Sequence, residues 1–149
     1  MSDLLPVTPF LRFIRRGKEA SPPKLVRAMR LFIADDSDVL RDSLSQMISE
    51  IKGVEIVGQA VDANSALEAI ETLKPDAVIL DIRMPKADGI LALESLKKKE
   101  GPPIVIMFTN YPYLQYRKRC LDAGADYFFY KATEFGLLIE LLKQLVGDF

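Results

Sequence analysis

Short apolar runs and longer amphipathic stretches alternate along the chain from residue 29 onward. Five runs are mostly apolar and include β-branched or aromatic residues, a composition that favours strands. After each run, apolar residues recur at spacings of three and four, which is typical of amphipathic helices. The strands expected from this pattern are residues 29–34, 54–60, 77–80, 104–108 and 127–130.

Capping and turn residues support these boundaries. Ser37 or Asp38 is a suitable N-cap for the first helix, and Asp62 or Asn64 for the second, while Gly53 ends the first. The fourth helix is expected over about residues 112–122. The apolar stripes of the first, second, third and fifth helices are, in this order, Leu40, Leu44, Met47, Ile48 and Ile51; Ala66, Leu67, Ile70 and Leu73; Ile90, Leu91, Leu93 and Leu96; and Leu137, Leu138, Leu141, Leu142 and Leu145.

Five strand–helix units in strict alternation predict an α/β fold. Continuously apolar strands belong to parallel sheets that are covered on both faces. Right-handed crossovers then give a flavodoxin-like, doubly wound sheet of five parallel strands with five helices, and 2-1-3-4-5 is the expected strand order. We assign residues 30–149 to this domain and residues 1–29 to an N-terminal extension.

The extension differs in composition from the domain. Residues 1–29 contain four of the nine prolines and no clear strand pattern. Thr8 could cap a short helix over residues 10–16, which is too short to be stable alone. Docking on its own domain or on a second copy, disorder, and contact with a partner or an anionic membrane surface are the alternatives. Our hypothesis is that the segment contributes to dimerisation or partner choice.

Composition narrows the chemistry. The chain has no histidine, so no histidine nucleophile, base or metal ligand is available. The formal net charge of −1 gives no general attraction to nucleic acid. A single cysteine, Cys120, cannot form an internal disulfide, and no apolar run is long enough to span a bilayer. We expect a soluble, cytoplasmic protein.

Polar residues follow four of the five expected strands. Because parallel strands end at the same edge of a sheet, these residues should lie close together near the point where the strand order reverses. Three carboxylates in a small space suit a hard divalent cation such as Mg²⁺. A hydroxyl and an ammonium group beside them could hold phosphoryl oxygens, and a carboxylate can accept a phosphoryl group. The residues are Asp35, Asp36, Asp81, Thr109 and Lys131.

Residues 30–146 resemble the receiver domain of two-component response regulators. The acceptor segment from Asp81 to Gly89 matches the family pattern D-x-x-M-P-x-x-D-G. The resemblance implies that Asp81 is the phosphoacceptor and that Mg²⁺ is the cofactor. The other implied roles are direct Mg²⁺ ligation by Asp36, Asp81 and the backbone carbonyl of Arg83, indirect support by Asp35, phosphoryl binding by Thr109 and Lys131, and a switching aromatic at Phe128.

The resemblance also implies the partners. A histidine kinase or a histidine phosphotransfer protein should donate the phosphoryl group, since this chain has no histidine. We expect a single-domain regulator, not an enzyme, that acts on an unknown downstream protein, with a homodimer through the fourth helix, fifth strand and fifth helix, or through the extension, as a further option. The basic run at Arg117–Arg119 is small, so direct DNA binding is not expected.

Two alternatives stay open at this point. The chain could be the receiver fragment of a DNA-binding transcriptional regulator, whose second strand the stretch at 53–60 resembles. From another class, it could be a flavodoxin-type small-molecule binder or a phosphohydrolase. Acidic residues rather than a glycine-rich loop follow the first strand, which argues against a dinucleotide site. Repeated turnover of a phosphoester would distinguish a hydrolase from a receiver that labels once.

Overall fold

The computed structural model describes residues 27–85, 88–111 and 113–148, in which five strands and five helices alternate. The helix expected at residues 10–16 lies outside the described residues, and the division at residue 29 stays a prediction. The elements are β1 (Met29–Ala34), α2 (Asp38–Ile48), β2 (Val54–Ala60), α3 (Ala63–Leu73), β3 (Ala77–Leu80), α4 (Gly89–Lys97), β4 (Ile104–Thr109), α5 (Leu114–Asp122), β5 (Tyr127–Tyr130) and α6 (Phe135–Val146).

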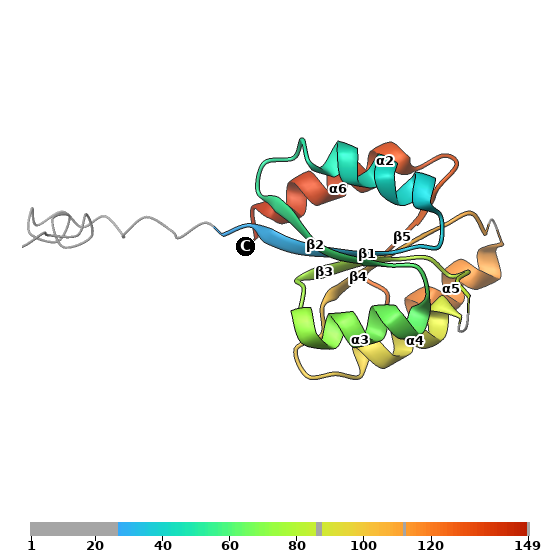
Figure 1. Ribbon diagram of the computed structural model, residues 1–149. Helices are drawn as coiled ribbons and strands as arrows, with labels where there is room; N and C mark the ends of the chain where they lie inside the picture. The colour runs from blue at the N-terminus through green and yellow to red at the C-terminus, as the bar shows by residue number, and fades with distance from the viewer. Residues whose placement is uncertain (1–26, 86–87, 112, 149) are drawn as a thin grey trace, which may run out of the picture.

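The strands form one parallel sheet with helices on both faces. Its order is β2-β1-β3-β4-β5, so the predicted fold class and strand order are confirmed. Helices α2 and α6 cover one face, and α3, α4 and α5 cover the other (Figure 1). β1 lies between β2 and β3, which places the reversal of strand order between β1 and β3.

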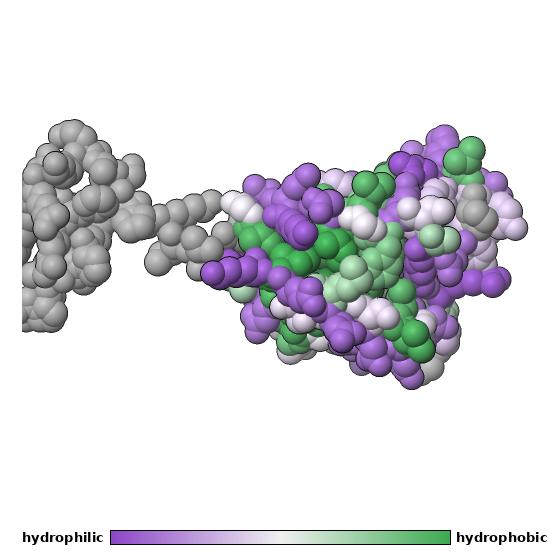
Figure 2. Space-filling view, turned by 90° about the horizontal axis from the view of Figure 1, so that it is seen from above, coloured by the Kyte–Doolittle hydropathy of each residue, from purple (hydrophilic) through white to green (hydrophobic). Residues whose placement is uncertain are grey.

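Two apolar layers flank the sheet, and successive residues of each central strand point into alternate layers. In β1, Leu31 and Ile33 pack with α2 and α6, while Phe32 and Ala34 pack with α3 and α4. Every one of these side chains is fully buried, which explains why β1 is apolar at each of these positions. Seen from the side of α2 and α6, hydrophilic residues cover much of the surface and hydrophobic residues show between them (Figure 2).

Side-chain caps fix where the first two helices begin. The Ser37 hydroxyl accepts a hydrogen bond from the Leu40 amide at 3.2 Å, and Asp62 accepts one from the Ser65 amide at 2.8 Å. Of the alternatives in the sequence, Ser37 and Asp62 are therefore the N-caps. The fourth helix begins at Leu114, later than expected, and β4 includes Thr109 because that residue continues the ladder with β5.

Candidate functional site

The carboxyl ends of four strands meet at one edge of the sheet. Ala34 and Leu80 are partners in the parallel ladder of β1 and β3, so Asp35 and Asp81, which follow them, are neighbours. The amide of Asp81 also donates a 3.1 Å hydrogen bond to the carbonyl of Ala34. Thr109 ends β4 and Lys131 follows β5. The edge thus brings together four of the residues that the sequence singled out.

Lys131 bridges the two buried carboxylates. Its Nζ atom lies 2.6 Å from Asp35 Oδ2 and 2.9 Å from Asp81 Oδ2. The side chains of Lys131, Asp35 and Asp81 are 12%, 3% and 7% exposed, so water screens these charges little. Thr109 is buried beside them and contributes to lowering the pKa of Asp81 against the effect of burial. One ammonium group therefore serves two buried carboxylates.

A third carboxylate completes an acidic cluster. One oxygen each of Asp35, Asp36 and Asp81 lies within 4.8 Å of the other two, and Asp36 is exposed whereas its neighbours are buried. Carboxylate oxygens are the ligands that Mg²⁺ prefers, usually one or two of them with several waters. The donor set fits this ion. Asp36 and Asp81 would hold it from the carboxyl ends of the neighbouring strands β1 and β3, while the buried Asp35 contacts Lys131.

Burial and charge act in opposite directions on the ionisable groups. Burial raises the pKa of Asp81 above its ordinary value, although the charge and hydrogen bond of Lys131 partly counteract it. Burial by itself would lower the pKa of Lys131, but hydrogen bonds and charges from Asp35 and Asp81 together raise it. The lysine is thus firmly cationic, whereas the ionised form of Asp81 is held at a cost that a bound cation would offset.

The acidic residues open into a cleft of about 440 Å³. The Arg83 guanidinium stacks over the Tyr111 ring at 4.7 Å from its centroid, and both residues line the cleft. The sequence indicates only the backbone of Arg83 as part of the site and Ser37 only as a helix cap, and it does not indicate Tyr111 and Tyr113 as lining residues. Their positions in the sequence could have indicated them as lining residues, because each lies within a few residues of a strand end that carries a site residue.

The Asp-Gly pair of the acceptor segment has a structural role. Asp88 accepts a 2.6 Å hydrogen bond from the Ile90 amide and caps α4. A Cβ atom added to Gly89 would lie only 1.9 Å from the carbonyl oxygen of Asp81. The glycine therefore permits α4 to start directly against the residue that follows β3, and a larger residue would displace the backbone of Asp81.

Phe128 lies in the apolar layer that α3, α4 and α5 cover, and its side chain is buried. The ring packs edge-on against Tyr130 with centroids 5.2 Å apart, and the guanidinium of Arg117 lies 5.6 Å from its centroid. Phe128 is not among the residues that line the 440 Å³ cleft. A switching role for this residue stays a prediction.

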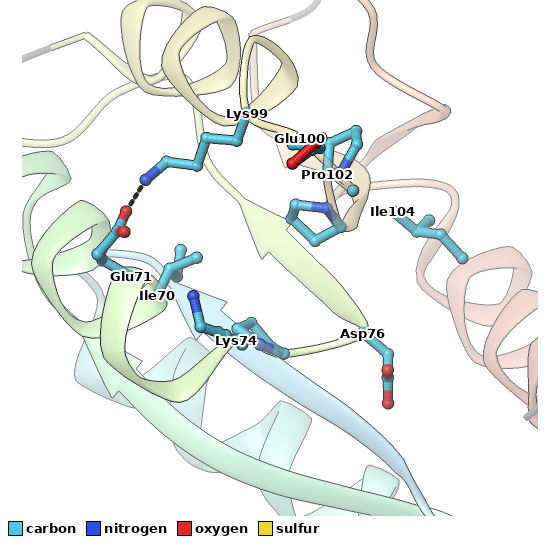
Figure 3. A pocket seen from close by; sticks show the side chains of 11 residues that line it. Ile70, Glu71, Lys74, Asp76, Lys99, Glu100, Pro102 and Ile104 are labelled. Carbon is cyan, nitrogen blue, oxygen red and sulfur yellow. Dashed lines mark hydrogen bonds and ion pairs between the residues drawn. The ribbon is translucent and has the colours of Figure 1, made fainter.

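A larger cavity, about 600 Å³, lies at the opposite edge of the sheet, where β3 and β4 begin. Its walls combine apolar residues such as Ile70 and Ile104 with charged ones (Figure 3). Lys99 is paired with Glu71 across it, and Asp76 is engaged by Arg27. The smaller cleft is the candidate site, because the cluster of three carboxylates, Thr109 and Lys131 lie there.

Fold and site define a flavodoxin-like α/β protein with an acidic, lysine-bridged site at the carboxyl edge of its sheet. The family model of the response regulator receiver domain matches residues 31–143, and the chain belongs to this family. No helix in the described ranges is long and apolar enough to cross a membrane.

Relatives and solved structures agree with this family. The transcriptional regulatory protein PdtaR of Mycobacterium tuberculosis is 38% identical over 120 residues, which cover 80% of this chain and 58% of PdtaR. The chain thus spans little more than half of that relative. The receiver domain of the response regulator NarL from M. tuberculosis is 25% identical with a TM-score of 0.75, covering 83% of this chain and 99% of that one.

Two further matches are a solved response regulator domain and a methylesterase. The response regulator domain of Thermotoga maritima CheB is 29% identical with a TM-score of 0.72, covering 82% of this chain and 96% of that one. A protein-glutamate methylesterase/protein-glutamine glutaminase of Dechloromonas aromatica is 45% identical over 78 residues, or 52% of this chain and 22% of the relative. Because so little of that relative is matched, its esterase name is not carried over; receiver domains are generally non-enzymatic switches.

Proposed function

We propose that this chain is a phosphoacceptor switch in which Asp81 receives a phosphoryl group from a phosphohistidine on a partner protein. The observation that carries the proposal is the Lys131 bridge to Asp35 and Asp81 inside a cleft that Thr109 also lines. A buried carboxylate with a cation and a hydroxyl beside it meets the requirements of phosphoryl transfer, which depends on positioning and charge neutralisation.

In the proposed step an oxygen of Asp81 attacks phosphorus while the P–N bond of the donor breaks, and the electron pair of that bond stays on the donor imidazole. Lys131 then exchanges its contact with Asp81 for a phosphoryl oxygen, and the Thr109 hydroxyl donates to another. Asp36 and Asp81, supported by the backbone carbonyl of Arg83, would hold Mg²⁺, which neutralises charge on the phosphoryl oxygens.

The test is covalent labelling by a small donor. Wild-type protein incubated with Mg²⁺ and acetyl phosphate should gain the mass of one phosphoryl group, and Asp81→Asn should gain none. Asp76→Asn is the matched control, because Asp76 lies at the opposite edge of the sheet and should label normally. Labelling of Asp81→Asn at the wild-type level would overturn the proposal, and repeated turnover of the donor without a stable label would favour a hydrolase.

A downstream protein is the proposed recipient of the signal, through the surface formed by α5, β5 and α6. β5 is at the edge of the described sheet, and exposed apolar side chains flank it on both helices. Leu114 and Leu137 are 76% and 54% exposed. A second copy of the chain could occupy the same surface; sedimentation of labelled and unlabelled protein would separate these occupants.

A second candidate is the receiver part of a longer transcriptional regulator. It is favoured by PdtaR, which is named a transcriptional regulatory protein and of which this chain matches 58%. In that case an additional domain, not this one, would carry the output. Salt-dependent binding of a DNA duplex by residues 27–148 alone would argue instead for direct contact through the basic run of α5.

A further inference from the structure

The turn between β1 and α2 carries both members of the acidic pair. The carboxylate of Asp35 is turned inward, where it meets Lys131 and also accepts a 2.9 Å hydrogen bond from the Ser37 amide. Asp36 is exposed, yet its carboxylate oxygen stays within 4.8 Å of those of Asp35 and Asp81. An exposed side chain on a turn keeps such a position only if the backbone that carries it is held.

Arg41 holds this backbone from within α2. Its Nη1 atom donates to the carbonyl oxygen of Asp35 at 2.5 Å, and its Nε atom donates to Oε1 of Gln59 on β2 at 3.2 Å. Its Nη2 atom contacts the carboxylate of Asp38. The Arg41 side chain is only 12% exposed. One guanidinium group thus ties the acidic turn to the strand beside it and to the first turn of the helix.

The carbonyl of Asp35 belongs to the same rigid peptide plane as the amide nitrogen of Asp36. The amide of Asp35 is fixed as well, because it donates a hydrogen bond to the carbonyl of Ala60 at 3.0 Å. With both ends of Asp35 held, the peptide that leads into Asp36 has little freedom to rotate. The contact of Arg41 therefore sets the direction in which the Asp36 carboxylate leaves the turn.

We propose that Arg41 is a positioning residue of the cation site, which orients Asp36 toward Asp81 without touching the ion. The inference rests on the proposed function, because it takes Mg²⁺ as the ligand of the acidic cluster. Arginine suits the task, since its planar group donates in three fixed directions at once. A lysine at the same position would keep the charge and lose this geometry.

Charge and geometry give opposite expectations, which makes the role testable. A positive group near a dication repels it, so a purely electrostatic Arg41 would weaken Mg²⁺ binding, and its removal would tighten it. A positioning Arg41 strengthens binding, and its removal weakens it. Loss of an outer partner that orients a metal ligand weakens metal affinity by roughly 10-fold or more.

The experiment is a calorimetric Mg²⁺ titration of the full chain without any phosphodonor. We expect roughly 10-fold weaker binding for Arg41→Lys and Arg41→Met. Arg30→Lys is the matched control, because Arg30 also donates to backbone carbonyls, those of Leu73 at 2.6 Å and Lys74 at 2.9 Å, but at the far edge of the sheet. Its Mg²⁺ affinity should equal that of the wild type.

Unchanged affinity in Arg41→Lys, or tighter binding in Arg41→Met, would overturn the positioning role. Wild-type protein that binds no Mg²⁺ would instead overturn the proposed function, and this inference with it. If the Arg41 variants fail to fold, Gln59→Leu removes one anchor of the guanidinium and should weaken Mg²⁺ binding in the same direction. Amide exchange without Mg²⁺ gives a second measurement: Asp36 and Ser37 should exchange faster in Arg41→Lys than in the wild type.

Discussion

The two edges of the sheet use charged residues in opposite ways. At the amino edge, both oxygens of Asp76 accept hydrogen bonds from Arg27 at 2.8 Å, and one also accepts from the Arg30 amide at 2.8 Å. At the carboxyl edge, Lys131 alone bridges two buried carboxylates, and a third lies nearby. At the amino edge, where charged residues anchor the strands, the negative charge of Asp76 is balanced by Arg27. At the carboxyl edge, negative charge is in excess, and a cation can bind there.

Cavity size alone would have pointed to the amino edge. The amino-edge cavity of about 600 Å³ is larger than the carboxyl-edge cleft of about 440 Å³. Two of its charged residues, Lys99 and Glu71, form an ion pair with each other. Both side chains are exposed to solvent, so this pair contributes little to the stability of the fold. The excess of carboxylates over cations, and not the volume of the cavity, therefore marks the carboxyl edge as the candidate site.

Replacing the lysine at each edge should give the largest contrast. Lys131→Met removes the cation that would stabilise the transferring phosphoryl group, and we expect its initial rate of labelling by acetyl phosphate to fall roughly 100-fold. Lys99→Met should label at the wild-type rate. Mass spectrometry of the intact protein over time measures both. An equal fall in the two variants would mean that the lysines act through general stability, which contradicts the proposed role of Lys131.

The fold followed from the sequence because its pattern has few physical solutions. The run at 77–80 is apolar at every position, and in the structure all four residues are buried between two helical layers. Continuous apolar strands that alternate with amphipathic helices leave little choice except a covered parallel sheet. Helix starts were less certain where no side chain caps the helix, as at Leu114.

The site could be predicted only as far as strand ends define it. Asp35, Asp81, Thr109 and Lys131 follow from parallel strands that end at one edge. The contact of Arg41 with the Asp35 carbonyl could not be predicted, because it depends on the rotamer of a long side chain one turn into a helix. The same holds for the Arg83–Tyr111 stack, whose members are far apart in sequence and share no pattern.

Glycines at the two edges provide a second contrast. Gly89→Ala places a Cβ atom 1.9 Å from the Asp81 carbonyl oxygen, which only backbone movement can relieve, and we expect a loss of about 2 kcal/mol in unfolding free energy. Gly101→Ala at the amino edge meets no atom within 4 Å but has a φ of +61°, so it should lose about 1 kcal/mol. Urea unfolding measures both losses.

Labelling separates these glycine variants further. Because Gly89→Ala displaces the backbone of Asp81, it should also slow labelling by acetyl phosphate, whereas Gly101→Ala should not. Wild-type stability and labelling in Gly89→Ala would contradict the close contact between the start of α4 and the acceptor strand.

We expect the smallest effect in how the contributions of Asp76 and Asp81 to the unfolding free energy depend on pH. Hydrogen bonds from Arg27 are the largest cause that lowers the pKa of Asp76, so its ionised form stabilises the fold above about pH 4, and this contribution is lost as the pH falls further. Asp76→Asn should therefore be less stable at pH 7 by about 1 kcal/mol, with the deficit shrinking in acid. Urea unfolding in Mg²⁺-free buffer at several pH values measures it.

Asp81 should behave in the opposite way. Burial raises its pKa, so the folded state holds a proton that the unfolded state releases, and the fold loses stability as the pH rises from the ordinary value through the raised one. Asp81→Asn removes this penalty and should be more stable than wild type at pH 7, with the gain vanishing near pH 4. Added Mg²⁺ should reduce this difference in unfolding free energy by stabilising the wild type, since the ion interacts with the carboxylate that the variant lacks. If Asp81→Asn were destabilised at neutral pH as Asp76→Asn should be, the Asp81–Lys131 contact would be a structural ion pair, and the contrast between the two edges would disappear.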